Sequence, residues 1–221
     1  LKVENIADLE QAIRAGLVQK LPGMGPKKAE NILRGIQFLK ESAGRISLGA
    51  ALPLVEEIIA ALVAETGLKR ISSAGSLRRM KETVGDIDIL AAAPDGRKVI
   101  KALTGLPMVR DVLAAGDTKG SVITRSGLQV DLRVVPEESY GAALQYFTGS
   151  KEHNVKLRGI AQRKGLKINE YGVFKGEEKL CGETEDEVYE AIGLQFIPPE
   201  LREDRGEVEA PEGRENRKER E

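Results

Sequence analysis

The chain carries the stretch GSLRRMKETVGDIDILA between Gly75 and Ala91, in which one isoleucine separates two acidic residues. Residues two apart on a β-strand point to the same side, so Asp86 and Asp88 would face one direction while Ile87 packs into the core. Paired carboxylates without a histidine favour a hard cation such as Mg²⁺, which prefers oxygen ligands. A solvated strand face that bears two aspartates is the alternative interpretation of this spacing.

A third acidic residue, Asp131, interrupts the otherwise apolar strand pattern of residues 128–135. An ionised carboxylate in a core strand is costly unless it has a partner or a metal. If this strand lies beside the first two aspartates, three carboxylates converge and can hold two Mg²⁺ ions roughly 4 Å apart, as phosphoryl transfer requires. Pairing of Asp131 with Arg133 or Arg125 is the open alternative.

The composition limits the remaining chemistry. The 221 residues are 31% charged and 41% hydrophobic, which suits one large domain or two to three small ones. One cysteine, Cys181, and one histidine, His153, leave almost no material for disulfides, zinc sites or Ser-His-Asp triads, so carboxylates must carry any catalysis. We expect His153 on the surface or facing DNA. No apolar run approaches the roughly 18 residues of a membrane helix, so we expect a cytoplasmic protein without a membrane partner.

Charge is concentrated in segments although the net charge is only −1. Residues 20–45 hold six bases against two acids, and residues 151–164 hold five bases against one acid. Residues 202–221 hold eight acids and six bases with almost no apolar residue. We therefore expect this last segment to be a disordered tail or a linker.

The periodicity of apolar residues predicts an α+β chain. Helices are expected at 5–15, from Pro26 to about 39, at 48–64, 97–103 and 184–192, with two more after Pro136 that break at 148–149. Strands are expected at 69–74, 85–91, 108–114, 121–125 and 128–135, with a strand-like patch at 167–174. The boundaries fall at 1–47, 48–136, 137–201 and 202–221: a helical head, a middle domain on a largely antiparallel sheet, a helical α/β domain and the charged tail.

Several motifs occur together. They are GSLRR at 75–79, GDID at 85–88, VDLR at 130–133, YFTGS at 146–150 followed by Asn154 and Arg158, and INEY at 168–171. A Gly-Ser pair at a strand end can present backbone N–H groups to a phosphate. In this order the motifs resemble the family X DNA polymerases, the DNA polymerase beta-like nucleotidyltransferases, from about residue 5 to residue 200. The resemblance implies a helix-hairpin-helix subdomain, a nucleotidyltransferase palm with a mixed, mostly antiparallel sheet, and a small α/β thumb.

The activity that the resemblance implies is that of a DNA-directed DNA polymerase of the repair, gap-filling type. It would transfer dNMP from dNTP to a primer 3′-hydroxyl and release pyrophosphate. Asp86 and Asp88 would bind both Mg²⁺ ions, for which Mn²⁺ can substitute, and Asp131 would bind the catalytic metal and help activate the hydroxyl. The expected partners are primer–template or gapped DNA and dNTP, and we expect a monomer, nucleoid-associated if the source is bacterial.

The resemblance also implies a nucleotide site. The β- and γ-phosphates would be held by Gly75, Ser76, Arg79 and Gly85, with Arg45 as a further contact. Tyr146 and Phe147 would line the sugar, and Gly149 would let the chain bend.

A basic helix face would complete that site. Lys151, Asn154 and Arg158 lie at i, i+3 and i+7, so all three can face one groove. Lys151 would hold phosphates, Asn154 would read the nucleotide in the minor groove, and Arg158 would touch the template. A solvated helix face is the alternative. Arg133 and Tyr171 would also contact DNA.

The LPGMGPKK stretch at 21–28 resembles the helix-hairpin-helix element. Gly23 and Gly25 would let the backbone approach a phosphate, and Lys27 and Lys28 would add counter-ion release. In the family the hairpin also binds a monovalent cation, Na⁺ or K⁺, through backbone carbonyls. Here the carbonyls would be those of Gln19, Leu21 and Met24. A plain Gly-Pro helix connector is the alternative.

Family members carry a lyase domain before the hairpin, and bacterial ones carry a PHP domain after the thumb. We expect a polymerase core without either domain. Two other functions stay open: another nucleotidyltransferase, such as a tRNA-end or small-molecule adenylyl-transferring enzyme, and a non-catalytic DNA-binding module.

Overall fold

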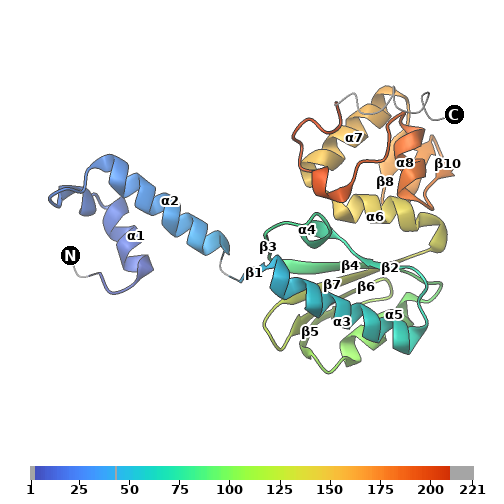
Figure 1. Cartoon of the computed structure of the whole chain (residues 1–221), viewed down its shortest axis with the longest axis horizontal. Coiled ribbons are helices and arrows are strands. Elements are labelled where there is room, and N and C mark those ends of the chain that lie inside the picture. The colour runs from blue at the N-terminus through green and yellow to red at the C-terminus, as the bar shows by residue number, and fades with distance from the viewer. Residues whose placement is uncertain (1–2, 43, 210–221) are drawn as a thin grey trace, which may run out of the picture. The chain divides into compact units, whose positions relative to one another are not determined.

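The computed structural model describes residues 3–42 and 44–209. The chain divides into two compact units, Leu1–Arg45 and Ile46–Glu221 (Figure 1). Each unit has its own buried apolar clusters. Within the described residues, no helix has the length and apolar character needed to cross a membrane.

The first unit is a helical hairpin. Helix α1 (Ile6–Arg14) begins at Asn5, whose side chain accepts a hydrogen bond from the Asp8 backbone N–H. A short 3₁₀ helix η1 (Val18–Lys20) and a tight turn lead into α2 (Pro26–Ser42). The buried contacts between the helices come from Ala12, Ile13, Val18, Ala29 and Ile36. Apart from Val18, which lies in η1, these residues lie on the apolar stripes of the two helices, which is why the expected helices form a pair.

The second unit is built on a five-stranded sheet, ordered β2-β4-β7-β6-β5. Its strands are β2 (Ile71–Ser73), β4 (Asp86–Ala92), β5 (Val109–Ala115), β6 (Lys119–Thr124) and β7 (Gln129–Val135). Only β4 and β7 run parallel, whereas the other pairs are antiparallel. The predicted α+β fold with a mixed, mostly antiparallel sheet is confirmed.

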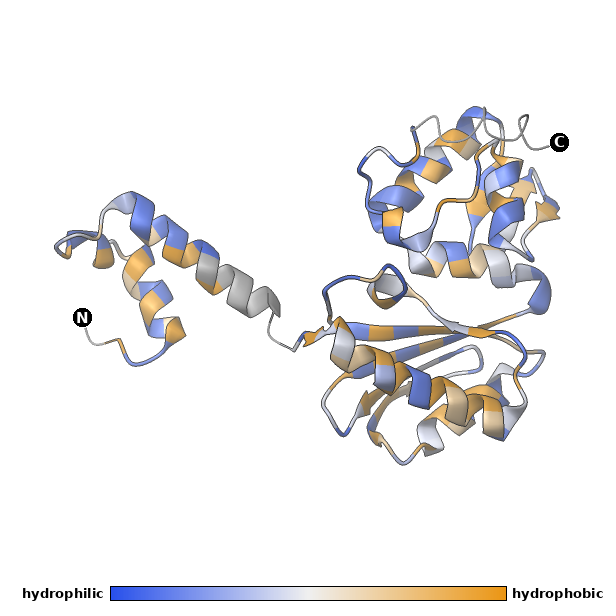
Figure 2. Cartoon of the chain, in the orientation of Figure 1, coloured by the Kyte–Doolittle hydropathy of each residue, from blue (hydrophilic) through white to orange (hydrophobic). Residues whose placement is uncertain are grey.

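The two faces of this sheet differ. Helices α3 (Leu48–Thr66) and α5 (Gly96–Gly105) cover one face, where Ile87 and Val130 are fully buried (Figure 1). Side chains alternate along a strand, so the aspartates of β4 and β7 point to the opposite face. Figure 2 shows this alternation as hydrophilic and hydrophobic bands along the central strands.

A small two-stranded sheet joins β1 (Ile46–Ser47) to β3 (Thr83–Val84) and was not expected from the sequence. Each of these strands has only two residues, which is too few for an alternation of apolar and polar residues to be recognised. The short helix α4 (Gly75–Arg78) lies between β2 and β3.

The remaining residues form a second, smaller layer. Its helices are α6 (Tyr140–Thr148), α7 (Lys151–Arg163) and α8 (Glu185–Ala191), and its strands are β8 (Lys167–Asn169), β9 (Gly172–Lys175) and β10 (Glu178–Cys181). Two 3₁₀ helices, η2 (Glu137–Ser139) and η3 (Pro199–Leu201), flank them. The core of this layer includes Leu157, Val173 and Tyr189. Helix α6 also packs on Leu90 and Val135 at the end of the large sheet.

An ion-pair network joins the two layers at Glu185. The Arg78 guanidinium donates to both carboxylate oxygens of Glu185 at 2.9 and 2.6 Å, and to Thr148 Oγ1 at 2.7 Å. Arg202 Nη1 donates to the same carboxylate at 2.7 Å, and its Nε donates to the Ile197 carbonyl at 2.8 Å. Although burial opposes ionisation, these arginines hold the pKa of Glu185 below its usual value.

The expectation of an unordered tail from residue 202 does not hold for residues 202–209. Arg202 has no exposed surface, and its guanidinium lies 5.2 Å from the ring centre of Tyr189 and 5.3 Å from that of Phe196. Val208 is buried in the same core. The sequence pattern did not reveal this order because the segment is held mainly by charge partners elsewhere in the fold, with Val208 as its one buried apolar residue among 202–209. Residues 210–221 lie outside the described residues.

We predict that Arg202→Ala lowers the free energy of unfolding of the second unit by about 3–5 kcal/mol, because it leaves a buried carboxylate without one of its two cations. Urea unfolding followed by circular dichroism measures the change. Arg205→Ala, three residues further on at an exposed position, is the matched control and should change stability by less than about 0.5 kcal/mol. Equal effects of the two substitutions would contradict the prediction.

Candidate active site

Three carboxylates meet on the face of the large sheet that is opposite α3 and α5. Strands β4 and β7 run side by side in parallel, and their register sets Asp88 directly opposite Asp131. Asp86 lies two residues before Asp88 and faces the same side. One oxygen from each of the three carboxylates lies within 4.8 Å of the others. The sequence pattern and the register together therefore produce the predicted convergence.

Gly75 makes room for this cluster. It is the first residue of α4 and has φ +56°, a conformation that favours glycine. A Cβ atom at this position would lie 2.0 Å from Asp88 Oδ2. A side chain would thus collide with the carboxylate, so the site requires glycine on both grounds.

The cluster is electrostatically unfavourable by itself. Burial, together with the neighbouring charges of Asp86 and Asp131, raises the pKa of Asp88 from 3.8 to about 6. Arg79 and Lys119 act in the opposite direction but do not compensate. A divalent cation among the three groups would remove the repulsion, which is the usual reason for such clusters.

Asp131 is held in a way that leaves one oxygen for a ligand. Gln129 Nε2 donates to Asp131 Oδ2 at 3.1 Å, whereas Asp131 Oδ1 is buried and has no hydrogen-bond partner among the described residues. Neither Arg125 nor Arg133, the two alternative partners, forms an ion pair with Asp131. Arg125 donates to the Pro107 carbonyl at 2.8 Å, and the Arg133 guanidinium lies over the Phe147 ring at 5.2 Å. Oxygen-only ligands with one oxygen unpaired suit a hard divalent cation.

A cleft of about 560 Å³ opens in front of the cluster. Its walls come from the two layers of the second unit. They are formed by Gly75, Ser76, Arg79, Asp86, Asp88, Tyr146, Phe147, Thr148, Gly149, Ser150, Lys151, Asn154 and Arg158. The structure therefore brings together most of the predicted metal and nucleotide residues in one place. Thr148 and Ser150 of the YFTGS motif line the cleft too, although no role was predicted for them.

The face of α7 that lines this cleft carries Lys151, Asn154 and Arg158, at the spacing expected for one helix face. Asn154 is held by two hydrogen bonds: its Oδ1 accepts from Gln145 Nε2 and its Nδ2 donates to the Tyr146 carbonyl, both at 2.7 Å. Gly149 ends α6 with φ +70°, so the chain does turn there. Lys151 and Arg158 are exposed and Asn154 is partly buried, so the binding roles of this helix face stay predictions.

Some predicted residues lie outside the cleft lining. Asp131 is one of them, although its carboxylate lies beside those of Asp86 and Asp88. Four others are also outside it. Gly85 directly precedes β4, and Arg133 stacks on Phe147. The side chain of Tyr171 is 53% exposed between β8 and β9. Arg45 is exposed and is the last residue of the first unit. The functional roles of these four residues stay predictions.

The hairpin of the first unit has a backbone that a phosphate can approach. Gly23 has φ +77°, and neither Gly23 nor Gly25 has a heavy atom within 4 Å of the place where a Cβ would stand. Lys27 and Lys28 are both exposed, and Lys28 Nζ donates to the Gly23 carbonyl at 2.8 Å.

Three residues were predicted to bind a monovalent cation through their carbonyls. The Leu21 carbonyl accepts from the Met24 backbone N–H at 3.0 Å, and Gln19 Nε2 donates to the Ile13 carbonyl at 3.1 Å. Leu21 and Met24 therefore lie in one tight turn, with Gln19 in the preceding 3₁₀ helix.

The prediction that His153 lies on the surface or faces DNA is wrong. It has no exposed surface; its Nδ1 lies 2.7 Å from Glu207 Oε1 and its Nε2 lies 2.9 Å from the Tyr189 hydroxyl. Burial lowers the pKa of His153, although Glu207 opposes the shift. The sequence around His153 does not reveal its burial, because its partners Tyr189 and Glu207 lie 36 and 54 residues away.

Comparison with known proteins places these observations in a family. A family model of the DNA polymerase beta thumb matches residues 143–203. The chain is 41% identical over 213 residues to the DNA polymerase/3′-5′ exonuclease PolX of Bacillus subtilis, which covers 95% of this chain and 37% of that protein. The chain belongs to the family X DNA polymerases. Two eukaryotic family X proteins match shorter parts: DNA-directed DNA/RNA polymerase mu of Homo sapiens, 36% identical over 78 residues, and DNA polymerase lambda of Rattus norvegicus, 32% identical over 83 residues.

These family X relatives are longer than the chain. The 78 residues matched in polymerase mu are 34% of this chain and 16% of that protein, and the 83 matched in polymerase lambda are 32% and 14%. Almost the whole chain matches the Bacillus protein, but it spans just over a third of the length of that protein.

We predict that Asp88→Asn stabilises the metal-free chain at pH 7.5. The pKa of Asp88 is higher in the folded chain than in the unfolded chain. Ionisation of Asp88 therefore destabilises the fold, and this loss of stability develops as the pH rises from about 4 to about 6. The rise of the Asp88 pKa from 3.8 to about 6 corresponds to about 2–3 kcal/mol of folding free energy. Urea unfolding in the presence of a chelator should show this gain at pH 7.5 and almost none at pH 4. A gain of equal size at both pH values would show that repulsion among ionised carboxylates is not its source.

Proposed function

We propose that the chain is the catalytic part of a DNA-directed DNA polymerase of the repair, gap-filling type. It transfers dNMP from a dNTP to a primer 3′-hydroxyl and releases pyrophosphate. The observation that carries the proposal is the convergence of Asp86, Asp88 and Asp131 at the wall of a cleft that Asp86 and Asp88 line together with a Gly-Ser turn and a basic helix face. Carboxylates beside phosphate-binding groups are the arrangement that nucleotidyl transfer needs.

The three aspartates would hold two Mg²⁺ ions, with Mn²⁺ as a substitute. These ions, when bound, neutralise the charge that develops on the phosphate oxygens in the transition state. Asp86 and Asp88 would contact both ions through β4. Asp131, fixed by Gln129, would turn its unpaired Oδ1 to the ion on the primer side and favour loss of the proton from the 3′-hydroxyl.

The dNTP would lie along the cleft. Ser76, Arg79 and Lys151 would hold its phosphates, since two cationic side chains and a hydroxyl line the wall near the aspartates. Tyr146 and Phe147, whose rings meet edge to face at 5.1 Å, would flank the sugar. Because the chemistry needs little beyond positioning and charge neutralisation, such a wall is sufficient to orient the nucleotide.

DNA would be held mainly through its backbone. Residues Gly23 and Gly25 leave open space beside two lysines, which favours a phosphate contact that does not read sequence. A Na⁺ or K⁺ ion bound by the carbonyls of the same turn would strengthen that contact. Arg133, Arg158 and Tyr171 would add contacts to the primer–template. The protein would act as a monomer on DNA in the cytoplasm.

The decisive experiment is primer extension on DNA with a one-nucleotide gap, supplied with one dNTP at a time. Extension only by the dNTP that complements the template, and only with a divalent metal, supports a polymerase. Template-independent addition would favour another nucleotidyltransferase. No extension, together with metal-independent DNA binding, would favour a non-catalytic DNA-binding module.

We predict that Asp131→Ala lowers the extension rate by about a thousandfold or more, because a metal ligand is lost, while the Kd for gapped DNA changes less than about twofold. Asp111→Asn is the matched control: Asp111 is an exposed aspartate on β5 of the same sheet and should extend like the unsubstituted chain. Residual extension near the normal rate in Asp131→Ala would refute the metal assignment.

We also predict that Lys27→Ala with Lys28→Ala reduces the slope of log Kd against log salt by about two, because two phosphate contacts are lost. Filter binding or fluorescence anisotropy over a series of KCl concentrations gives the slope. Lys98→Ala with Lys101→Ala on α5, on the face of the sheet away from the aspartates, is the charge-matched control and should leave the slope unchanged. An unaltered slope for the hairpin variant would count against DNA binding there.

A further inference from the structure

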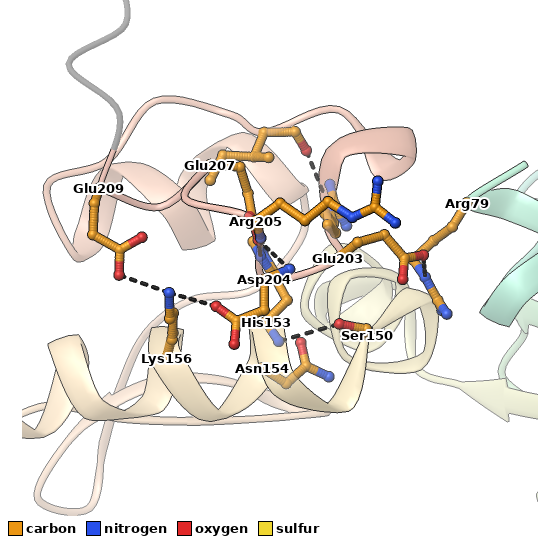
Figure 3. A network of polar contacts seen from close by, with 12 residues as sticks. Arg79, Ser150, His153, Asn154, Lys156, Glu203, Asp204, Arg205, Glu207 and Glu209 are labelled. Atoms are coloured by element: carbon orange, nitrogen blue, oxygen red, sulfur yellow. Dashed lines mark hydrogen bonds and ion pairs between the residues drawn. The ribbon is translucent and has the colours of Figure 1, made fainter. Parts of the chain in front are cut away.

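The segment Glu203–Glu209, here called the brace, supplies a carboxylate that pairs with Arg79, one of the residues that line the cleft. Arg79 Nε donates to Glu203 Oε1 at 2.8 Å (Figure 3). Lys81 Nζ lies 3.2 Å from Glu203 Oε2. The Arg79 and Glu203 side chains are only 14% and 20% exposed. This ion pair joins residues 124 positions apart in the sequence.

Arg79 is fixed from two sides. Besides the bond to Glu203, its Nη1 donates to the Thr148 carbonyl at 2.5 Å. The third nitrogen, Nη2, makes no hydrogen bond within the part of the chain that the structure describes. The bonds of Nε and Nη1 fix the orientation of the guanidinium, because this planar group cannot rotate without breaking both of them. Nη2 is thus left to bind a ligand.

Glu203 contacts Arg79 from outside the cleft and does not occupy the space where a ligand of Arg79 would bind. Arg79 is among the residues that line the cleft, whereas Glu203 is not. Although burial opposes ionisation, hydrogen bonds from Arg79 and Lys81 hold the pKa of Glu203 below its usual value, so the carboxylate is charged at neutral pH.

The brace is anchored to α7, the helix that presents Lys151 and Asn154. Glu207 lies 2.7 Å from the buried ring of His153 and accepts the Arg205 backbone N–H at 2.7 Å. Lys156 pairs with both Asp204 and Glu209, and Figure 3 shows it between the two carboxylates. Glu203 is therefore held by bonds on both sides and is not a loose surface acid.

We propose that Glu203 is a positioning residue that orients Arg79 for the β- and γ-phosphates of the incoming dNTP. The inference rests on the proposed function, since it takes Arg79 as a phosphate contact. A guanidinium that is already oriented loses less side-chain entropy when the triphosphate binds, so the brace should strengthen nucleotide binding rather than the chemical step. The opposite role, in which Glu203 competes with the triphosphate for Arg79, predicts the opposite sign for its removal.

The test measures kcat and the dNTP KM on one-nucleotide-gapped DNA for Glu203→Ala and Glu203→Gln. We expect Glu203→Ala to raise KM about tenfold with kcat within about twofold, and Glu203→Gln to have a smaller effect because its amide oxygen can still accept from Nε. Glu209→Gln, a half-exposed carboxylate of the brace that does not touch Arg79, is the matched control and should leave both constants within about twofold.

A double substitution shows whether the effect passes through Arg79. In an Arg79→Ala background, Glu203→Ala should cause no further rise in KM. Circular dichroism shows whether each variant is folded, and Glu203→Gln, which keeps the shape of the side chain, stands in if Glu203→Ala is not.

Three results would overturn the proposal. A fall in KM on removal of Glu203 would show competition, an unchanged KM would show no role, and an equal rise with Glu209→Gln would show a general loosening of the brace. If the unsubstituted chain itself extends no primer, the proposed function fails and this inference with it. Failure of the inference alone leaves template-directed extension by the unsubstituted chain intact.

Discussion

Three negative charges held within 4.8 Å of one another are the constraint on which the rest of the structure depends. Such a cluster disfavours folding until a cation neutralises it, so other interactions must hold the strands in place. They come from the opposite face of the sheet, where Ile87 and Val130 are buried under α3 and α5. The parallel register of β4 and β7 then fixes the aspartates to within the reach of one ion.

The smaller layer must also stand in a defined position over that cluster, because it supplies the other wall of the cleft. Glu185 joins the layers by accepting from Arg78 on one side and Arg202 on the other. Buried charges of this kind are costly to separate, so the network specifies one arrangement more than it adds stability. Residues 202–209, which continue from Arg202, therefore belong to the architecture of the site.

The sequence was informative where a feature is local. Alternation predicted that Asp86 and Asp88 share a face, helical spacing predicted that Lys151, Asn154 and Arg158 share another, and the ordered motifs predicted the family. It failed where a residue's partners are remote. A buried His153 and a packed Arg202 look like any solvated charged residues, because neither neighbouring residues nor periodicity reveal a partner that lies far along the chain.

The amino-acid sequence by itself determined which side chains share a strand or helix face, because the periods of two and 3.6 residues follow from backbone geometry alone. Only the tertiary structure decided that Asp131 lies opposite Asp88, that Gly75 is the residue against which Asp88 packs, and that Glu203 reaches Arg79. These contacts depend on strand order and on the packing of one layer over the other. Neither is encoded in any single stretch, since each arises from the combined burial of apolar surface along the whole second unit.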